Sequence, residues 1–141
     1  MAARWPGGDT GPVNKISESH GVRVLTVEPA EPALGSESAA LDLIGEAFGE
    51  QASVVVVPAD RVDPGFFALR TRIAGDVVRK FAGYRIRLVV VGDISMQIAE
   101  SESLRAFVYE TNKGRDIWFL ADDAELNARL RGEGSSLGRS G

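Results

Sequence analysis

Polar residues suited to ligand or metal chemistry follow three apolar runs, at 54–57, 88–91 and 117–120, that are typical of buried strands. These residues are Asp60, Asp63, Gly92, Asp93, Ser95, Asp122 and Asp123. In open α/β sheets, ligands bind beyond the carboxyl ends of the strands. Carboxylate oxygens gathered there could hold Mg²⁺, which would make this edge a small-molecule site or a metal-assisted active site. The interpretation that we favour is simpler, because aspartates commonly cap helices and form turns.

Composition excludes several other reaction types. The chain contains no cysteine, so it forms neither a disulfide nor a thiolate nucleophile. His20 is the only histidine, and its position before Gly21 indicates a turn residue rather than a general base. Ser101 and Ser103 have no evident base beside them, and their acidic surroundings indicate the start of a helix. We therefore assign no catalytic residue, no metal ligand and no cofactor.

A second group of candidate binding residues lies on a helix expected at 64–82. Thr71 and Gly75 are four residues apart on one flank, where small side chains would let a ligand or another helix approach. Tight packing against the sheet is the alternative for this pair. Arg70 belongs to a basic group extending to Arg87 that could meet phosphate or an acidic protein, or could form a solvated face with ion pairs at helical spacing.

Asn112 lies in a polar and aromatic group with Tyr84, Tyr109 and Glu110. Buried tyrosine hydroxyls and amides need hydrogen-bond partners, so we expect mainly a structural network here. The candidate binding residues as a set are Asp60, Asp63, Arg70, Thr71, Gly75, Gly92, Asp93, Ser95 and Asn112.

The elements that must position these residues alternate between strand and helix. An N-terminal hairpin is expected at 13–27, followed by a helix capped by Ser36 or Ser38 with Leu41, Ile44 and Phe48 inward. Strands are expected at 53–57, 86–91 and 116–120, and helices at 64–82, 101–112 and after Asp122, with 95–100 as a connection. The order β-β-α-β-α-β-α-β-α predicts an α/β fold with a mixed sheet of about five strands and crossover helices.

Length and charge are those of one ordinary globular domain. The 141 residues are 44% hydrophobic and 26% charged, enough to bury a core without disulfides. We expect a single domain at 12–131, with disordered segments at 1–11 and 132–141, which are rich in glycine and small polar residues. No apolar run approaches the ~20 residues of a membrane span, and 1–11 lacks the apolar stretch of a secretory signal. The prediction is a cytoplasmic protein with no membrane partner.

Four strings carry a resemblance to a known family. They are residues 69–76 (LRTRIAGD), 79–85 (RKFAGYR), 91–95 (VGDIS) and 107–114 (FVYETNKG). They resemble a small bacterial family, domain of unknown function 4180, from about residue 13 to residue 130. The family has no established activity, so the resemblance supports the fold rather than a function.

The order of elements also resembles the STAS fold of sulfate transporters and anti-sigma-factor antagonists. Those antagonists carry a switch serine at the start of a helix that corresponds to the segment 59–66 here. This segment contains no serine or threonine, so the resemblance gives no reason to expect a kinase-controlled switch. Asp60 or Asp63 could imitate the charge of a phosphoserine, although capping is the interpretation we favour.

The leading functional hypothesis is a non-enzymatic regulatory or protein-interaction domain of a bacterial cytosol. Its partner would be another protein or a second copy of the chain, bound by the helix at 63–80 and the turn at 91–95. The alternative is a small-molecule-binding protein or metal-assisted enzyme at the acidic strand ends. Nucleic-acid binding is the least favoured hypothesis, because the formal net charge of −4 opposes attraction of phosphates.

Overall fold

Five strands form one mixed sheet in the computed structural model, which describes residues 14–28 and 33–140, with side chains as far as residue 132. The order across the sheet is β1-β2-β3-β4-β5, with β1 antiparallel to β2 and all other neighbours parallel. The strands are β1 (Lys15–Ser19), β2 (Val22–Thr26), β3 (Val54–Pro58), β4 (Arg87–Val91) and β5 (Ile117–Leu120). The predicted α/β fold with a five-stranded mixed sheet is confirmed.

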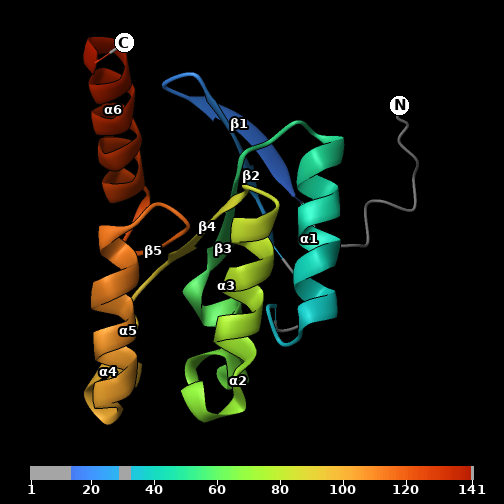
Figure 1. The fold of residues 1–141 in the computed structure, drawn as a ribbon, viewed down its shortest axis with the longest axis vertical. Helices are drawn as coiled ribbons and strands as arrows, with labels where there is room; N and C mark the ends of the chain where they lie inside the picture. The colour runs from blue at the N-terminus through green and yellow to red at the C-terminus, as the bar shows by residue number, and fades with distance from the viewer. Residues whose placement is uncertain (1–13, 29–32, 141) are drawn as a thin grey trace.

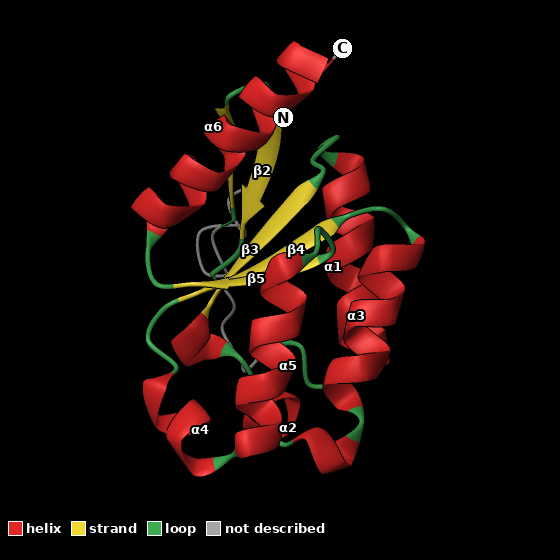
Figure 2. Cartoon of the chain, turned by 60° about the vertical axis from the view of Figure 1, so that its left-hand side comes forward, coloured by secondary structure: helices red, strands yellow, loops and turns green. Residues whose placement is uncertain are grey.

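Within the described ranges, six α-helices and two short 3₁₀ turns connect and cover the strands (Figure 1). They are α1 (Glu37–Gly49), η2 (Ala59–Arg61), α2 (Pro64–Phe67), η3 (Leu69–Thr71), α3 (Ile73–Gly83), α4 (Ser95–Glu100), α5 (Glu102–Lys113) and α6 (Asp123–Ser140). Figure 2 shows α1, α3 and α5 on one face of the sheet and α6 crossing the other face. The STAS-like arrangement remains a prediction.

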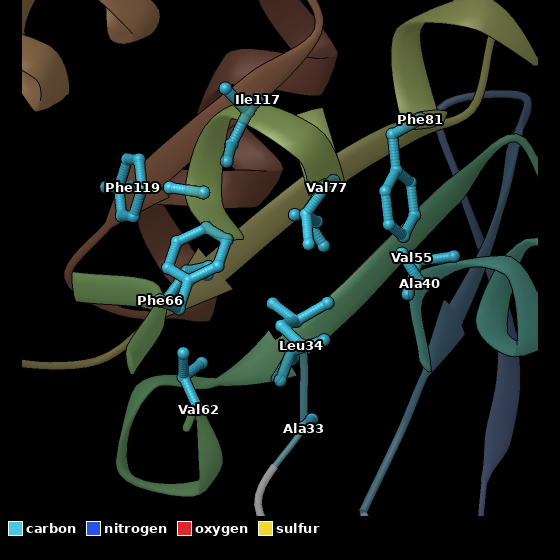
Figure 3. Packing of buried hydrophobic residues seen from close by; sticks show 14 of the residues in the cluster. Ala33, Leu34, Ala40, Val55, Val62, Phe66, Val77, Phe81, Ile117 and Phe119 are labelled. Atoms are coloured by element: carbon cyan, nitrogen blue, oxygen red, sulfur yellow. The ribbon is translucent and has the colours of Figure 1, made fainter. Parts of the chain in front are cut away.

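Two apolar clusters fill the two faces of the sheet. The larger one joins the sheet to α1 through α5 and includes Phe66, Val77, Phe81 and Phe119 (Figure 3). The smaller one contains Trp118, which is 2% exposed, and its helical members among the described residues are Leu126 and Leu130 of α6. Trp118 and Phe119 therefore face opposite sides of β5, as the alternation along a strand requires.

Local capping chemistry starts four helices where the sequence indicated. Ser36 accepts a hydrogen bond from the amide of Ala39 at 3.1 Å, and Asp63 accepts one from Gly65 at 2.7 Å. Ser101 accepts from the amide of Leu104 at 3.1 Å. Asp122 accepts from the amide of Glu125 at 2.9 Å. Each cap satisfies an amide that would otherwise lack a partner in the first helical turn.

The N-terminal hairpin also matches its sequence signal. His20 and Gly21 have φ angles of 53° and 82°. Two consecutive positive φ angles belong to the tight turn whose twist matches that of the two flanking strands. His20 is thus confirmed as a turn residue. The predicted disordered lead at 1–11 lies outside the described residues.

The single helix predicted at 64–82 is wrong. The chain forms α2, then η3, and then α3, with Arg72 in the left-handed region at a φ of 67°. The hydroxyl of Thr71 lies 2.8 Å from the carbonyl oxygens of Gly65 and Ala68, and it accepts from the amide of Ile73 at 3.2 Å. A threonine hydroxyl that competes for backbone partners in this way interrupts a continuous helix.

The connection predicted at 95–100 is instead the short helix α4. Asp93 accepts a hydrogen bond from the amide of Ser95 at 2.9 Å, which satisfies one amide at the start of this helix. The sequence offered a single turn of apolar spacing, Ile94 to Ile98, and a run this short does not distinguish a helix from a loop.

The inward face of α1 also differs from the prediction. Ala40, Ile44 and Ala47 are buried, whereas Leu41 is 38% exposed and Phe48 is 52% exposed. Small alanines allow α1 to lie close to the sheet and to α3. Because the face with the alanines is the buried one, the larger side chains of Leu41 and Phe48 lie on the exposed side. Periodicity alone could not choose between these two apolar stripes.

The C-terminal helix buries Leu126 and Leu130, as predicted. Its backbone continues as helix to Ser140, whereas the composition of 132–141 predicted a disordered tail. Extending an existing helix requires far less free energy than nucleating one, which favours continuation past residue 131. In the described part of the chain, no helix has both the length and the apolar character needed to cross a bilayer.

Candidate functional site

An open groove of about 700 Å³ lies beyond the ends of β3 and β4. One wall comes from the segment after β3, which contains η2, α2 and η3, and the other comes from α4 and the start of α5. Figures 1 and 2 show α2 and α4 at the same end of the molecule. The polar lining residues are Asp60, Arg70, Gln97, Glu100, Ser101 and Ser103. Ligands of open α/β sheets bind in this position relative to the strands.

Asp60 and Arg70 are the two sequence-predicted candidates that this groove brings together. Asp60 belongs to η2, directly after β3, and Arg70 belongs to η3. Thr71 fixes η3 through its hydroxyl, which ties the turn back to the carbonyl oxygens of Gly65 and Ala68. The break between α2 and α3, which the sequence did not predict, therefore places Arg70 at the groove instead of on the flank of one longer helix.

The opposite wall contains two residues, Gln97 and Glu100, that were not predicted from the sequence. Gln97 and Glu100 lie on α4, three residues apart, and Ser103 follows in the first turn of α5. The sequence signal that could have identified them is the four-residue spacing of Ile94 and Ile98. This spacing is typical of one apolar helix face, and it would place Gln97 and Glu100 on the polar side of a short helix. The floor is apolar and includes Val62, Phe67, Leu69 and Leu104 among its members.

The charged side chains of the groove have no partner within the described part of the chain. Arg70, Asp60 and Glu100 form neither a hydrogen bond through their side chains nor an ion pair with any described residue. All three side chains are exposed to solvent. One cation and two carboxylates are thus presented beside an apolar floor, an arrangement suited to a ligand that carries both charges and apolar groups.

Metal and nucleophilic chemistry receive no support from this lining. The described ranges contain no group of three or more histidine, aspartate or glutamate side chains that could hold a metal ion. The strand-end aspartates therefore do not form the cluster that the sequence allowed. Ser101 uses its hydroxyl oxygen to cap α5. Among the described lining residues, none is a histidine, cysteine or lysine.

Asp63 has a structural role next to the groove. Its side chain caps α2, and its amide donates to the carbonyl oxygen of Ala33 at 2.7 Å. The amide of Ala33 in turn donates to Arg61 at 2.7 Å. Gly35 lies so close that a Cβ there would be 2.9 Å from a carboxylate oxygen of Asp63. These contacts confirm the capping interpretation and anchor the chain before α1.

Gly92, Asp93 and Ser95 lie in a separate hollow of about 360 Å³ with Phe119 and Glu125. Two hydrogen bonds from Ser95 hold the pKa of Asp93 below its usual value of 3.8. The hydroxyl of Ser95 has the larger effect and its amide the smaller one. Asp93 thus serves the start of α4, and it does not line the groove that contains Asp60.

Gly75 lies in a third hollow, of about 400 Å³, between α3 and Phe107 of α5. A Cβ on Gly75 would meet no atom within 4 Å, so the expected close approach of another part of the chain is wrong. The shared helix flank expected for Thr71 and Gly75 is also wrong, because η3 and α3 are separated at Arg72.

Asn112 is confirmed as a structural residue. Its side chain accepts from the amide of Phe119 at 2.7 Å and donates to the carbonyl oxygen of Phe119 at 3.1 Å, which fastens α5 to β5. Tyr84 and Tyr109 are 48% and 64% exposed, so the expected buried tyrosine network is wrong.

The chain is thus an α/β protein with a mixed five-stranded sheet and an open groove at the carboxyl ends of its strands. The family model described as "Domain of unknown function (DUF4180)" matches residues 19–130, and the protein belongs to this family. Comparisons with curated proteins and with solved structures found no match.

Proposed function

We propose that this protein is a non-enzymatic regulatory domain that binds a segment of another protein in the groove lined by Asp60, Arg70 and Glu100. The observation that carries the proposal is the set of three charged side chains without partners beside an apolar floor. A protein segment offers basic, acidic and apolar side chains together, so it can complement all of them at once.

Charge argues against a polyanion in the same groove. Asp60 and Glu100 outnumber Arg70, and a nucleic-acid backbone would meet net repulsion there. The whole chain carries a formal net charge of −4. The proposal places the protein in a bacterial cytosol, which the absence of cysteine supports.

A small zwitterionic molecule is the second candidate, and the size of the groove favours it. Small-molecule sites commonly have volumes of about 300–1,000 Å³, and this groove has about 700 Å³. Such a ligand would use Arg70 for its carboxylate and Asp60 or Glu100 for its cation.

Selection from a random peptide library against the full chain separates the candidates. We expect enriched peptides that carry at least one acidic residue, and we expect Arg70→Glu to weaken their binding by about tenfold or more, which corresponds to ~1.4 kcal/mol. The matched control is Arg131→Glu, which makes the same change of charge on α6 at an exposed side chain outside the groove.

Two results would contradict the peptide proposal. One is equal binding of the selected peptides to the Arg70→Glu variant. The other is an empty selection together with NMR shift changes, confined to the groove, upon addition of free amino acids; this result would favour the small-molecule candidate. Far-UV circular dichroism of both variants confirms that the fold is retained.

A further inference from the structure

Large apolar side chains of α1 and of the C-cap of α3 are exposed, and none of them lines the groove. Phe48 is 52% exposed, Tyr84 is 48% exposed and Leu41 is 38% exposed. The rings of Phe48 and Tyr84 meet edge to face, with their centroids 5.8 Å apart. Covering this group would remove apolar surface from water, which favours association.

The two helices beside this group carry opposite charges. α1 and its C-cap contain four acidic residues and no basic one, whereas α3 and its flanking residues contain four basic residues and one acidic one. The acidic residues of α1 are Glu37, Asp42, Glu46 and Glu50, and the basic residues around α3 are Arg72, Arg79, Lys80 and Arg85. Figure 1 shows α1 and α3 side by side.

Part of this charge is already paired within the chain. Arg79 lies 2.7 Å from Asp76, and Lys80 lies 3.8 Å from Glu37. In the described ranges, the side chains of Glu50 and Arg85 have no ion pair or hydrogen bond. An acidic helix and a basic helix with unpaired charges therefore flank one exposed apolar strip.

We propose that this face binds a second copy of the chain, with α1 of each copy lying against α3 of the other. A two-fold axis parallel to the helices produces this arrangement, because it exchanges the positions of α1 and α3 across the interface. An axis perpendicular to the helices would instead place the acidic α1 against its own copy. Charge complementarity selects the first symmetry.

The contact between Phe48 and Tyr84 sets the level of the two helices along the axis. It places the C-terminal end of α1 beside the C-terminal end of α3. Rotation about a parallel axis preserves these levels, so Glu50 lies at the level of the partner's Arg85, and the two aromatic pairs meet beside the axis at the C-terminal end of the face.

The size of the face indicates a dimer that dissociates on dilution. The 13 residues of α1 give a helix about 20 Å long. Two helices of about 10 Å diameter lying side by side thus present a face of about 20 Å by 20 Å, at the low end for specific interfaces.

Sedimentation equilibrium of the full chain over a range of concentrations tests this dimer. We expect Phe48→Glu to weaken dimerisation at least about tenfold. The matched control is Tyr109→Glu, which introduces the same charge at an exposed aromatic residue of α5, and it should leave dimerisation unchanged. A monomer at every concentration, or equal weakening by the two variants, would overturn the proposal.

A charge exchange tests the symmetry with two exposed residues that contribute nothing to the core. Glu50→Arg and Arg85→Glu should each weaken dimerisation, and the double variant should recover most of the loss. Strengthening by Glu50→Arg alone would contradict the proposal, because it would mean that acidic helices face each other. Peptide binding in the groove does not depend on these residues, so failure of the dimer leaves the proposed function to its own test.

Discussion

Gly92 lies against Ala59, and a Cβ on residue 92 would be only 2.7 Å from the Cβ of Ala59. This contact joins the residues that follow β3 and β4, and Ala59 is itself a lining residue of the groove. Gly92 also has a φ of 144°, a backbone angle that residues other than glycine rarely adopt. Position 92 therefore requires glycine for two independent reasons, and the groove depends on it.

Gly92→Ala should lower the free energy of unfolding by about 2–3 kcal/mol, through a steric clash with Ala59 and an unfavourable backbone angle. Urea denaturation measures this loss. Gly75→Ala is the matched control, because a Cβ there meets no atom within 4 Å and the residue lies in the first turn of α3. That control should raise stability by up to about 1 kcal/mol; a loss in both variants would show that the clash is not the cause.

Asn112→Ala should lower stability by about 2 kcal/mol, because the amide and the carbonyl oxygen of Phe119 both lose their side-chain partner. Thermal unfolding and urea denaturation provide the measurement. The control, Asn127→Ala, removes one exposed hydrogen bond to Ser19 and should change stability by less than about 0.5 kcal/mol. Similar losses in both variants would argue against the fastening of α5 to β5 by Asn112.

Thr71→Val should loosen η3 and disturb the position of Arg70, since the hydroxyl no longer ties the turn to Gly65 and Ala68. Hydrogen exchange of the amides between 65 and 73 should become faster, Ile73 included, with a loss of about 1 kcal/mol in local stability. Thr71→Ser keeps the hydroxyl and should keep most of the protection. Unchanged exchange in Thr71→Val would mean that backbone contacts alone hold the turn.

Asp93 should make stability depend on acid pH. Because Ser95 holds the folded-state pKa below 3.8, the stabilising effect of the carboxylate is complete above that pH and disappears as the pH falls through the lower, folded value. The difference in unfolding free energy between wild type and Asp93→Asn should therefore be larger at about pH 6 than at about pH 2. Asp42→Asn removes an exposed carboxylate elsewhere and serves as the control.

The strands could be predicted from the sequence because the apolar runs of a central parallel sheet are long and unbroken. The caps at Ser36, Asp63 and Ser101 could be predicted for a different reason, since each depends on chemistry within three residues. From these local signals, the order of the strands along the chain and the starts of most helices were predicted correctly.

The groove could be predicted only in part. Asp60 and Arg70 were candidates individually, but both line the groove only because the helix breaks at Arg72, where the hydroxyl of Thr71 binds backbone groups of neighbouring turns. Gln97 and Glu100 were missed because α4 spans only 6 residues, too few for a periodic pattern. The exposed stripe of α1 was assigned inward because spacing does not show which apolar stripe meets the sheet.

One face of the sheet has a single helical cover among the described residues. Trp118 lies there under α6, between the guanidinium groups of Arg87 and Arg129 at 4.1 and 4.3 Å from its ring. The leucines that complete this layer, Leu126 and Leu130, come late in the chain. During synthesis on the ribosome, this apolar face of the sheet would thus stay exposed to water until residue 130 has emerged. Cooperative folding of the domain would begin only after that point.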